Sequence, residues 1–285
     1  MNRLQFTVYT STVPQRLTKV FGLAADGTLT KTTAASMSAG TAQRAAAASL
    51  TELADRLDRL TSAQAVGWGI GASELATVVA QDADTGTDPT RVSRTRRNFV
   101  YPKGPGILML DHDGIPEGGL DRDGLRLRLI DACPVLAMAP MLWRPSASAG
   151  LVAPDGRGLT GLFRHRIYIP VQDASLIPEA GKRLVTLLWA AGKGWHEVGS
   201  AGQALARTLV DSSVWQPERL DFAAPPILTD GIRRPIATAL VYGDPTALFD
   251  LSGIVTTAAD DKDAAKRRRE SRDAIKQQCK LQRET

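Results

Sequence analysis

Residues 107–114 read Ile-Leu-Met-Leu-Asp-His-Asp-Gly, an apolar run that ends in two aspartates one residue apart. The run follows Gly104-Pro105-Gly106, and its length predicts a short buried strand over Ile107–Leu110. Because side chains alternate along a strand, Asp111 and Asp113 should project from the same face at its end. Two close carboxylates repel each other, so we expect a divalent cation that prefers oxygen ligands, Mg²⁺ or Mn²⁺, between them.

An Asp-x-Asp pair is also typical of an exposed turn or of an acidic strand end, so the pair alone does not decide between these interpretations. The calcium-loop pattern D-x-D-x-D-G is not matched, because Gly114 and Ile115 occupy the positions of a polar ligand and its partner. The apolar run before the pair favours a position at the rim of a buried sheet.

The segments after this run alternate between helical and strand periodicity. Together they predict the order β-α-β-β-α-β, which is that of an RRM-like or ferredoxin-like plait within the α/β (α+β) class. The expected elements are the strand at 107–110, a helix over 120–132, strands over 135–143 and 164–171, a helix over 175–192 that stops at Gly192, and a strand within 205–214.

The chain divides into three expected units. Residues 1–105 form an N-terminal α/β module, with a strand at Leu4–Tyr9 and an amphipathic helix that begins at the capping-box sequence Ser49-Leu-Thr-Glu52. The RRM-like module spans residues 106–258 and packs against the first. Residues 259–285 are dense in charge and predict a solvated helix, a linker or a disordered tail.

Several other side chains are candidates for a site that binds nucleotides or metal. His165 lies in the alternating stretch Arg164-His-Arg-Ile-Tyr168, where it could donate to an anion or be a partly buried strand residue. Asp211 follows the apolar pair Leu209-Val210 as Asp111 follows Met109-Leu110, and Asp221 is the competing third acid. Arg207 could bind phosphate, while Arg94, Arg96 and Arg97 form a basic cluster that contacts phosphates or is a solvated face.

Composition narrows the class of protein. The 285 residues carry a formal net charge of +5 and are 43% hydrophobic, which fits a globular protein with a polyanionic partner. Cys133 and Cys279 are far apart and predict no zinc site. No apolar run reaches the length of a membrane span, so we expect a cytoplasmic protein without a membrane partner. P-loop, G-x-S-x-G and C-x-x-C motifs are absent.

Taken in order, these motifs resemble the archaeo-eukaryotic primase superfamily, in particular the primase-polymerase domains of plasmids, phages and mobile elements. Leu108-Met-Leu-Asp-His-Asp113 is similar to the hDhD motif of that family, His165 in Arg164–Tyr168 to its sxH motif, and Leu209-Val-Asp211 to its hD motif. The resemblance spans most of residues 1–255. It departs at Phe163, where the family has a small residue.

The resemblance implies a DNA primase and DNA polymerase that transfers nucleotides with two divalent metals. Template and primer would be single-stranded DNA, the substrates NTPs or dNTPs, and a helicase or a further replication domain is a candidate partner. It implies metal ligation by Asp111, Asp113 and Asp211 (or Asp221), nucleotide binding by Ser148, Arg164, His165 and Arg207, and DNA binding by Arg94, Arg96 and Arg97.

Two other functions fit the same residues. A non-catalytic, replication-associated module would bind nucleic acid and use the acids for its fold or for idle metal binding. A two-metal nuclease would degrade DNA without needing nucleotides. The resemblance favours synthesis over both.

Overall fold

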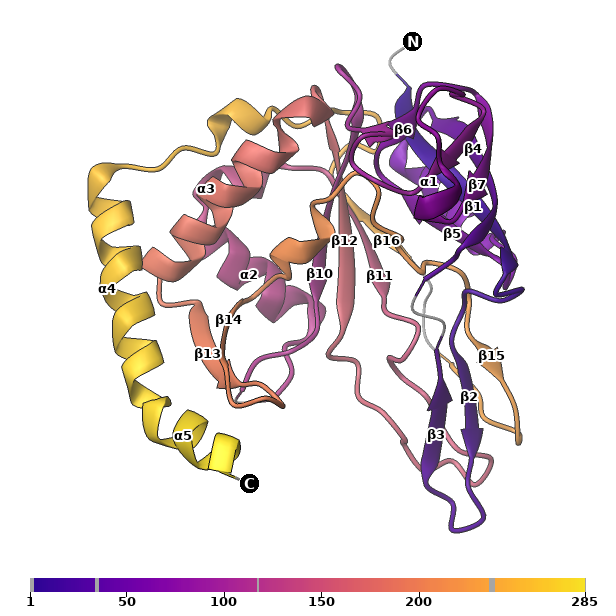
Figure 1. The fold of residues 1–285 in the computed structure, drawn as a ribbon. Coiled ribbons are helices and arrows are strands. Elements are labelled where there is room, and N and C mark those ends of the chain that lie inside the picture. The colour runs from indigo at the N-terminus through magenta and orange to yellow at the C-terminus, as the bar shows by residue number, and fades with distance from the viewer. Residues whose placement is uncertain (1–2, 34–35, 117, 236–238, 285) are drawn as a thin grey trace.

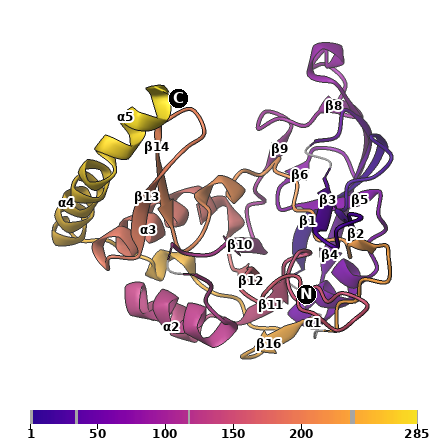
Figure 2. The same cartoon turned by 90° about the horizontal axis from the view of Figure 1, so that it is seen from below.

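The computed structural model describes residues 3–33, 36–116, 118–235 and 239–284, which form a mixed α/β fold with several sheets and five α-helices (Figure 1). A five-stranded sheet from the first hundred residues lies beside a four-stranded sheet from the rest of the chain. Helices cover the opposite side of the four-stranded sheet in both views (Figures 1 and 2). The four-stranded sheet is therefore the middle layer.

The N-terminal sheet has the strand order β5-β1-β4-β7-β8. Its first three neighbour pairs are antiparallel and the last is parallel. Helix α1 follows β4, and the Ser49 side chain caps it by accepting from the backbone of Glu52. The elements are β1 (Leu4–Val13), β4 (Ala39–Ala47), α1 (Leu50–Asp58), β5 (Gln64–Gly67), β7 (Leu75–Val79) and β8 (Arg91–Ser93).

The middle sheet has the order β10-β12-β11-β16, and every neighbouring pair is antiparallel. Strands β10 and β11 therefore run parallel with β12 between them, and α2 connects them, which makes a split β-α-β unit. All residues of β12 are buried, as in a central strand with both faces covered. The elements are β10 (Gly106–His112), α2 (Arg122–Ala132), β11 (Met141–Pro145), β12 (His165–Val171) and β16 (Leu240–Tyr242).

The remaining elements flank these two sheets. Helix α3 ends in a Schellman motif at Gly192, whose φ is +70°, with the Lys193 amide donating to the Leu188 carbonyl at 2.7 Å. Helix α4 packs along α3 (Figures 1 and 2). These elements are β2 (Val20–Leu23), β3 (Leu29–Thr32), β6 (Ile70–Gly71), β9 (Phe99–Val100), α3 (Ile177–Ala190), β13 (Gly194–Val198), β14 (Ala204–Thr208), β15 (Ile227–Leu228), α4 (Ala258–Ala274), α5 (Lys276–Glu284) and the 3₁₀ turns η1 (Gln81–Ala83), η2 (Pro134–Met138), η3 (Ala174–Leu176), η4 (Ser212–Val214) and η5 (Leu251–Gly253).

Two predicted strands differ from those observed. The first part of the expected strand 135–143 is the 3₁₀ turn η2, which Pro134 opens, and β11 begins only at Met141. The expected last strand of the plait does not join the middle sheet: β14 pairs with β13 in a separate hairpin. A four-stranded RRM-like sheet in the predicted order is therefore not formed, although the β-α-β-β-α part of the order is present.

One core joins the two main sheets. Phe6 of β1 and Leu53 of α1 belong to the same buried cluster as Leu108 of β10, Leu129 of α2 and Leu184 of α3. The N-terminal residues thus bury apolar surface against the middle sheet, and a smaller cluster around Tyr9 and Phe99 lies within the N-terminal part itself. Among the described residues, no helix combines the length and apolar composition that crossing a membrane requires.

The shared core predicts that both parts of the chain unfold together. Leu53→Ala should lower the free energy of unfolding by about 2–5 kcal/mol, because Leu53 is fully buried and the change leaves a cavity. In urea titrations, the unfolding midpoints measured by circular dichroism and by tryptophan fluorescence should shift by the same amount. Leu127→Ala is the control: its side chain is 65% exposed, and the change should stay within about 0.5 kcal/mol. Two separate transitions, only one of them moved by Leu53→Ala, would contradict a single core.

Candidate active site at the end of strand β10

Three aspartates converge where β10 ends. Asp111 is the penultimate residue of β10 and Asp113 follows the strand. Residues 209–215 run along the free edge of β10, because the Asp211 amide donates to the Asp111 carbonyl at 2.8 Å and the Trp215 indole donates to the Met109 carbonyl at 2.7 Å. The structure therefore brings Asp211 next to the Asp111–Asp113 pair without a paired strand.

Asp221, the competing third acid, is committed to a buried ion pair. Its carboxylate lies 2.7 Å from Nη1 of Arg166 and accepts from the Tyr168 hydroxyl at 2.9 Å. Its backbone pairs with Val66 of β5. Only 2% of the Asp221 side chain is exposed. Its charge is therefore compensated inside the protein by Arg166, and this ion pair holds the N-terminal sheet to β12.

Asp111 shares the same arginine at a longer distance. Its Oδ1 atom lies 3.7 Å from Nε of Arg166, which stands directly opposite it in the β10–β12 register. Burial raises the pKa of Asp111 to about 6; Arg166 opposes this shift, while Asp113, Asp221 and Asp211 add to it. Asp111 therefore carries a charge that its surroundings only partly compensate.

Lys19 is a second cation near the carboxylates. Its side chain is half-buried at the start of β2. Burial lowers its pKa, as do Arg166 and Lys31, while Asp113 and Asp111 act in the opposite direction. The N-terminal module thus contributes a positive group to the electrostatics of the aspartates.

His165 lies on the other face of the middle sheet from Asp111. It stands opposite His112 in the register, whereas Asp111 stands opposite Arg166. Nε2 of His165 lies 3.1 Å from the Leu120 carbonyl, and its ring stacks on His112 with 6.3 Å between centroids. Burial lowers the pKa of both histidines. The structure does not bring His165 together with the aspartates.

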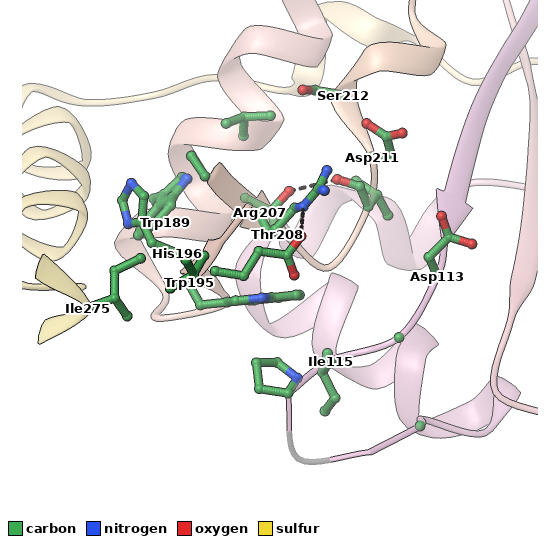
Figure 3. A pocket seen from close by; sticks show the side chains of 18 of the residues that line it. Asp113, Ile115, Trp189, Trp195, His196, Arg207, Thr208, Asp211, Ser212 and Ile275 are labelled. Carbon is green, nitrogen blue, oxygen red and sulfur yellow. Dashed lines mark hydrogen bonds and ion pairs between the residues drawn. The ribbon is translucent and has the colours of Figure 1, made fainter. Parts of the chain in front are cut away.

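A pocket of about 1140 Å³ opens beside the aspartates. Asp113, Asp211, Arg164 and Arg207 line it, together with residues of α3, the β13–β14 hairpin and the C-terminal helices. Figure 3 shows Asp113 and Asp211 on one side of the pocket and Trp189 and His196 on the other. Its volume is large enough for a nucleotide.

The three nucleotide-binding candidates besides His165 lie in or near this pocket. Arg164 is exposed, lines the pocket, and contacts the hydroxyl of the buried Ser148 at 3.4 Å. Arg207 lines the pocket as well and pairs through Nε with Glu197. Both guanidinium groups keep further N–H donors for an anion.

The basic cluster lies apart from the aspartates, around Glu218 and Asp84. Arg94 is largely buried and donates to the Glu218 carbonyl at 2.9 Å, so it supports the loop that carries Glu218. The side chain of Arg96 is 67% exposed and that of Arg97 is 63% exposed. They pair with Glu218 and Asp84 respectively, and their exposure leaves them accessible to phosphate.

The acids are not arranged as a complete metal centre. Within the described residues, no three His, Cys, Asp or Glu side chains form a group that could hold a metal ion. Both carboxylate oxygens of Asp211 accept from Ser213, from its amide at 2.8 Å and its hydroxyl at 2.7 Å. Asp111 and Asp113 fit a cation better, because the charge of Asp111 is only partly compensated and Asp113 is exposed.

Sequence reasoning missed Arg166, Lys19 and the aromatic wall of the pocket. Arg166 could have been found from the alternation in Arg164-His-Arg166, which puts both arginines on the face opposite to His165. No local pattern marks Lys19, Trp189 or Trp195, because they reach the site through contacts distant in sequence.

The raised pKa of Asp111 predicts a pH dependence of stability in the metal-free protein. Because the folded state holds this proton more tightly than the unfolded state, ionisation of Asp111 costs stability as the pH rises from about 4 through 6. Asp111→Asn removes this cost, so in EDTA the variant should gain stability relative to the unmodified protein by roughly 3 kcal/mol between pH 4 and pH 8.

Chemical unfolding at a series of pH values measures this difference. Asp55→Asn is the matched control, because Asp55 is exposed on α1 and the same change there leaves the buried carboxylate of Asp111 in place. A difference for Asp111→Asn that shrinks as the pH rises would contradict the desolvated carboxylate.

Comparison with known proteins gives no relative. No protein-family model, no curated protein and no solved structure matches the chain.

Proposed function

We propose that this chain is a metal-dependent nucleotidyltransferase of the primase-polymerase type, which copies single-stranded DNA from nucleoside triphosphates. The observation that carries the proposal is the convergence of Asp111, Asp113 and Asp211 at the end of β10, beside a pocket that Arg164 and Arg207 line. Carboxylates and arginines in one pocket suit a triphosphate that needs both a cation and direct phosphate donors. The split β-α-β unit of the middle sheet supports an RRM-like catalytic module.

Asp111 and Asp113 would hold the divalent cation, Mg²⁺ or Mn²⁺. The cation would polarise the α-phosphate and favour ionisation of the attacking 3′-hydroxyl. Asp211 would join as the third ligand through the lone pairs that Ser213 leaves free on its carboxylate. Asp221 would act indirectly by holding Arg166 in place behind Asp111.

Arg164 and Arg207, which both line the pocket, would bind the triphosphate. In this arrangement His165 is a packing residue, because its Nε2 faces the Leu120 carbonyl on the other side of the sheet. Arg96 and Arg97 would contact the template phosphates, since both are exposed. Template, primer and nucleotides would be the partners, with a helicase or a further replication domain as an additional candidate.

A non-catalytic nucleic-acid-binding module is the second candidate function. It is favoured by one observation: the described residues contain no group of three metal ligands. Ser213 donates to the carboxylate of Asp211, and Arg166 forms an ion pair with Asp221. In that function the basic surface would bind DNA and the acids would not take part in chemistry.

A synthesis assay separates these candidates. The protein is mixed with single-stranded DNA, labelled nucleotides and Mg²⁺ or Mn²⁺, with and without a primer. The variant Asp111→Asn/Asp113→Asn should lose synthesis by about a thousandfold or more, because metal stabilisation of the transition state is worth several kcal/mol. Asp55→Asn on α1 should synthesise normally.

The outcomes decide between three functions. Products that depend on metal and on the two aspartates support a polymerase, and products without primer support priming. Binding of DNA without any product favours the non-catalytic module. Degradation of the template without nucleotides indicates a nuclease.

Arg164 gives a separate kinetic prediction. Arg164→Gln should raise the KM for nucleoside triphosphate by about tenfold, because one charge-assisted contact to phosphate is lost. Arg128→Gln is the control, since Arg128 is exposed on α2 and outside the pocket. An unchanged KM for Arg164→Gln, with synthesis intact, would remove Arg164 from the nucleotide site.

A further inference from the structure

The pocket beside the aspartates has an aromatic wall that the proposed chemistry does not use. Trp189 of α3 and Trp195 and His196 of β13 line it. Trp189 is fully buried and packs against His196, with 5.2 Å between ring centroids. Trp195, in contrast, is only half-buried, and within the described part of the chain no other ring stacks on it.

Trp195 is held in place by the hairpin and faces the aspartates. It stands directly opposite Arg207 in the β13–β14 register, so the two side chains share one face of the hairpin. Figure 3 shows the indole ring directed from the hairpin toward the side of the pocket where Asp113 lies. Among the described residues Arg207 uses only its Nε donor, for Glu197, and keeps its terminal amino groups for another partner.

The C-terminal helices complete the same wall. Arg268 of α4 lies over the Trp189 ring, 5.6 Å from its centroid, and lines the pocket with Ile275 and Gln278. The Ser271 hydroxyl accepts from the His196 amide at 2.9 Å and so ties the hairpin to α4. Helices α4 and α5, in the segment 259–285 that the sequence predicts as a solvated helix, a linker or a disordered tail, therefore supply a cationic and an apolar surface to the pocket.

This combination fits one class of ligand. A half-buried indole gives a flat apolar face for stacking, and the arginines that line the same pocket give donors for phosphate. A planar base linked to phosphate matches both parts, whereas a simple anion would leave the indole unused and an apolar ligand would leave Arg207 and Arg268 unmatched.

We propose that Trp195 is a stacking platform for a nucleobase, with Arg207 and Arg268 binding the phosphates linked to it. The base belongs either to a bound nucleoside triphosphate or to a single-stranded nucleic acid that passes the aspartates. This inference rests on the proposed function for its choice of ligand, but it concerns binding and does not need turnover.

Equilibrium binding tests the platform. Two probes are used: a labelled single-stranded DNA of about 16 nucleotides in EDTA, and a labelled nucleoside triphosphate with Mg²⁺. Trp195→Ala should weaken binding of at least one probe about fivefold or more, as loss of one base–aromatic stack does. Trp195→Phe is the matched control, because a phenyl ring keeps most of the stacking face and should stay within about threefold of the unmodified protein.

The two probes identify the source of the base. Loss confined to the DNA probe assigns the platform to a nucleic-acid strand, and loss confined to the triphosphate assigns it to the nucleotide; both support the inference. The inference is overturned if a Trp195→Ala variant with the melting temperature of the unmodified protein binds both probes with unchanged affinity. A Phe variant as weak as the Ala variant, or an unmodified protein that binds neither probe, also overturns it.

Two further controls keep the test decisive. Trp195→Leu, which keeps an apolar side chain on the hairpin, repeats the test if the Ala variant is unstable, and it should bind as weakly as the Ala variant is expected to. The failures of the two proposals can be told apart. Binding that depends on Trp195 without any synthesis rejects only the polymerase. Synthesis whose rate is unchanged by Trp195→Ala rejects only the platform.

Discussion

The buried guanidinium of Arg166 is the group on which the arrangement of the site depends. It bonds to Asp221 and to the Phe222 carbonyl at 2.7 and 2.8 Å, and it lies behind Asp111. Burial alone would lower the pKa of Arg166, but the carboxylates of Asp221 and Asp111 more than offset this effect. Removal of Arg166 or of Asp221 would leave an uncompensated charge in the core, which is costly. The ion pair therefore holds β12, the 221–222 segment and β5 together.

One guanidinium near several carboxylates cannot compensate all of them. Asp221 takes the short contact and is further satisfied by the Tyr168 hydroxyl, whereas Asp111 is left at 3.7 Å with Asp113 and Asp211 nearby. Burial raises the pKa of Asp111, and this unequal division leaves the shift only partly opposed. The same division explains why a cation at the end of β10 would be stabilised, since the additional positive charge would act where the protein itself provides too little.

The separate hairpin is what creates the pocket. In the predicted plait the last strand would belong to the same sheet as β10. Instead β14 pairs with β13, and the hairpin is anchored to α4 through Ser271. The edge of β10 is taken by residues 209–215, which satisfy its carbonyls with one backbone amide and the Trp215 indole. The space between hairpin and strand is then lined by groups from four distant segments of the chain.

The sequence by itself determined the elements whose causes are local. The apolar run before Asp111, the alternation around His165 and the cap at Ser49 are features of neighbouring residues, and β10, β12 and α1 form where they predict. Tertiary structure alone decided four other features. They are the face on which His165 lies, the ion pair between Asp221 and Arg166, the pairing of β14 with β13 and the packing of α4. Each depends on which strand meets which and in what register, and a shift of one residue in register would exchange the two faces of β12. Such pairings are set by burial and charge summed over the whole core, which no short stretch of sequence contains.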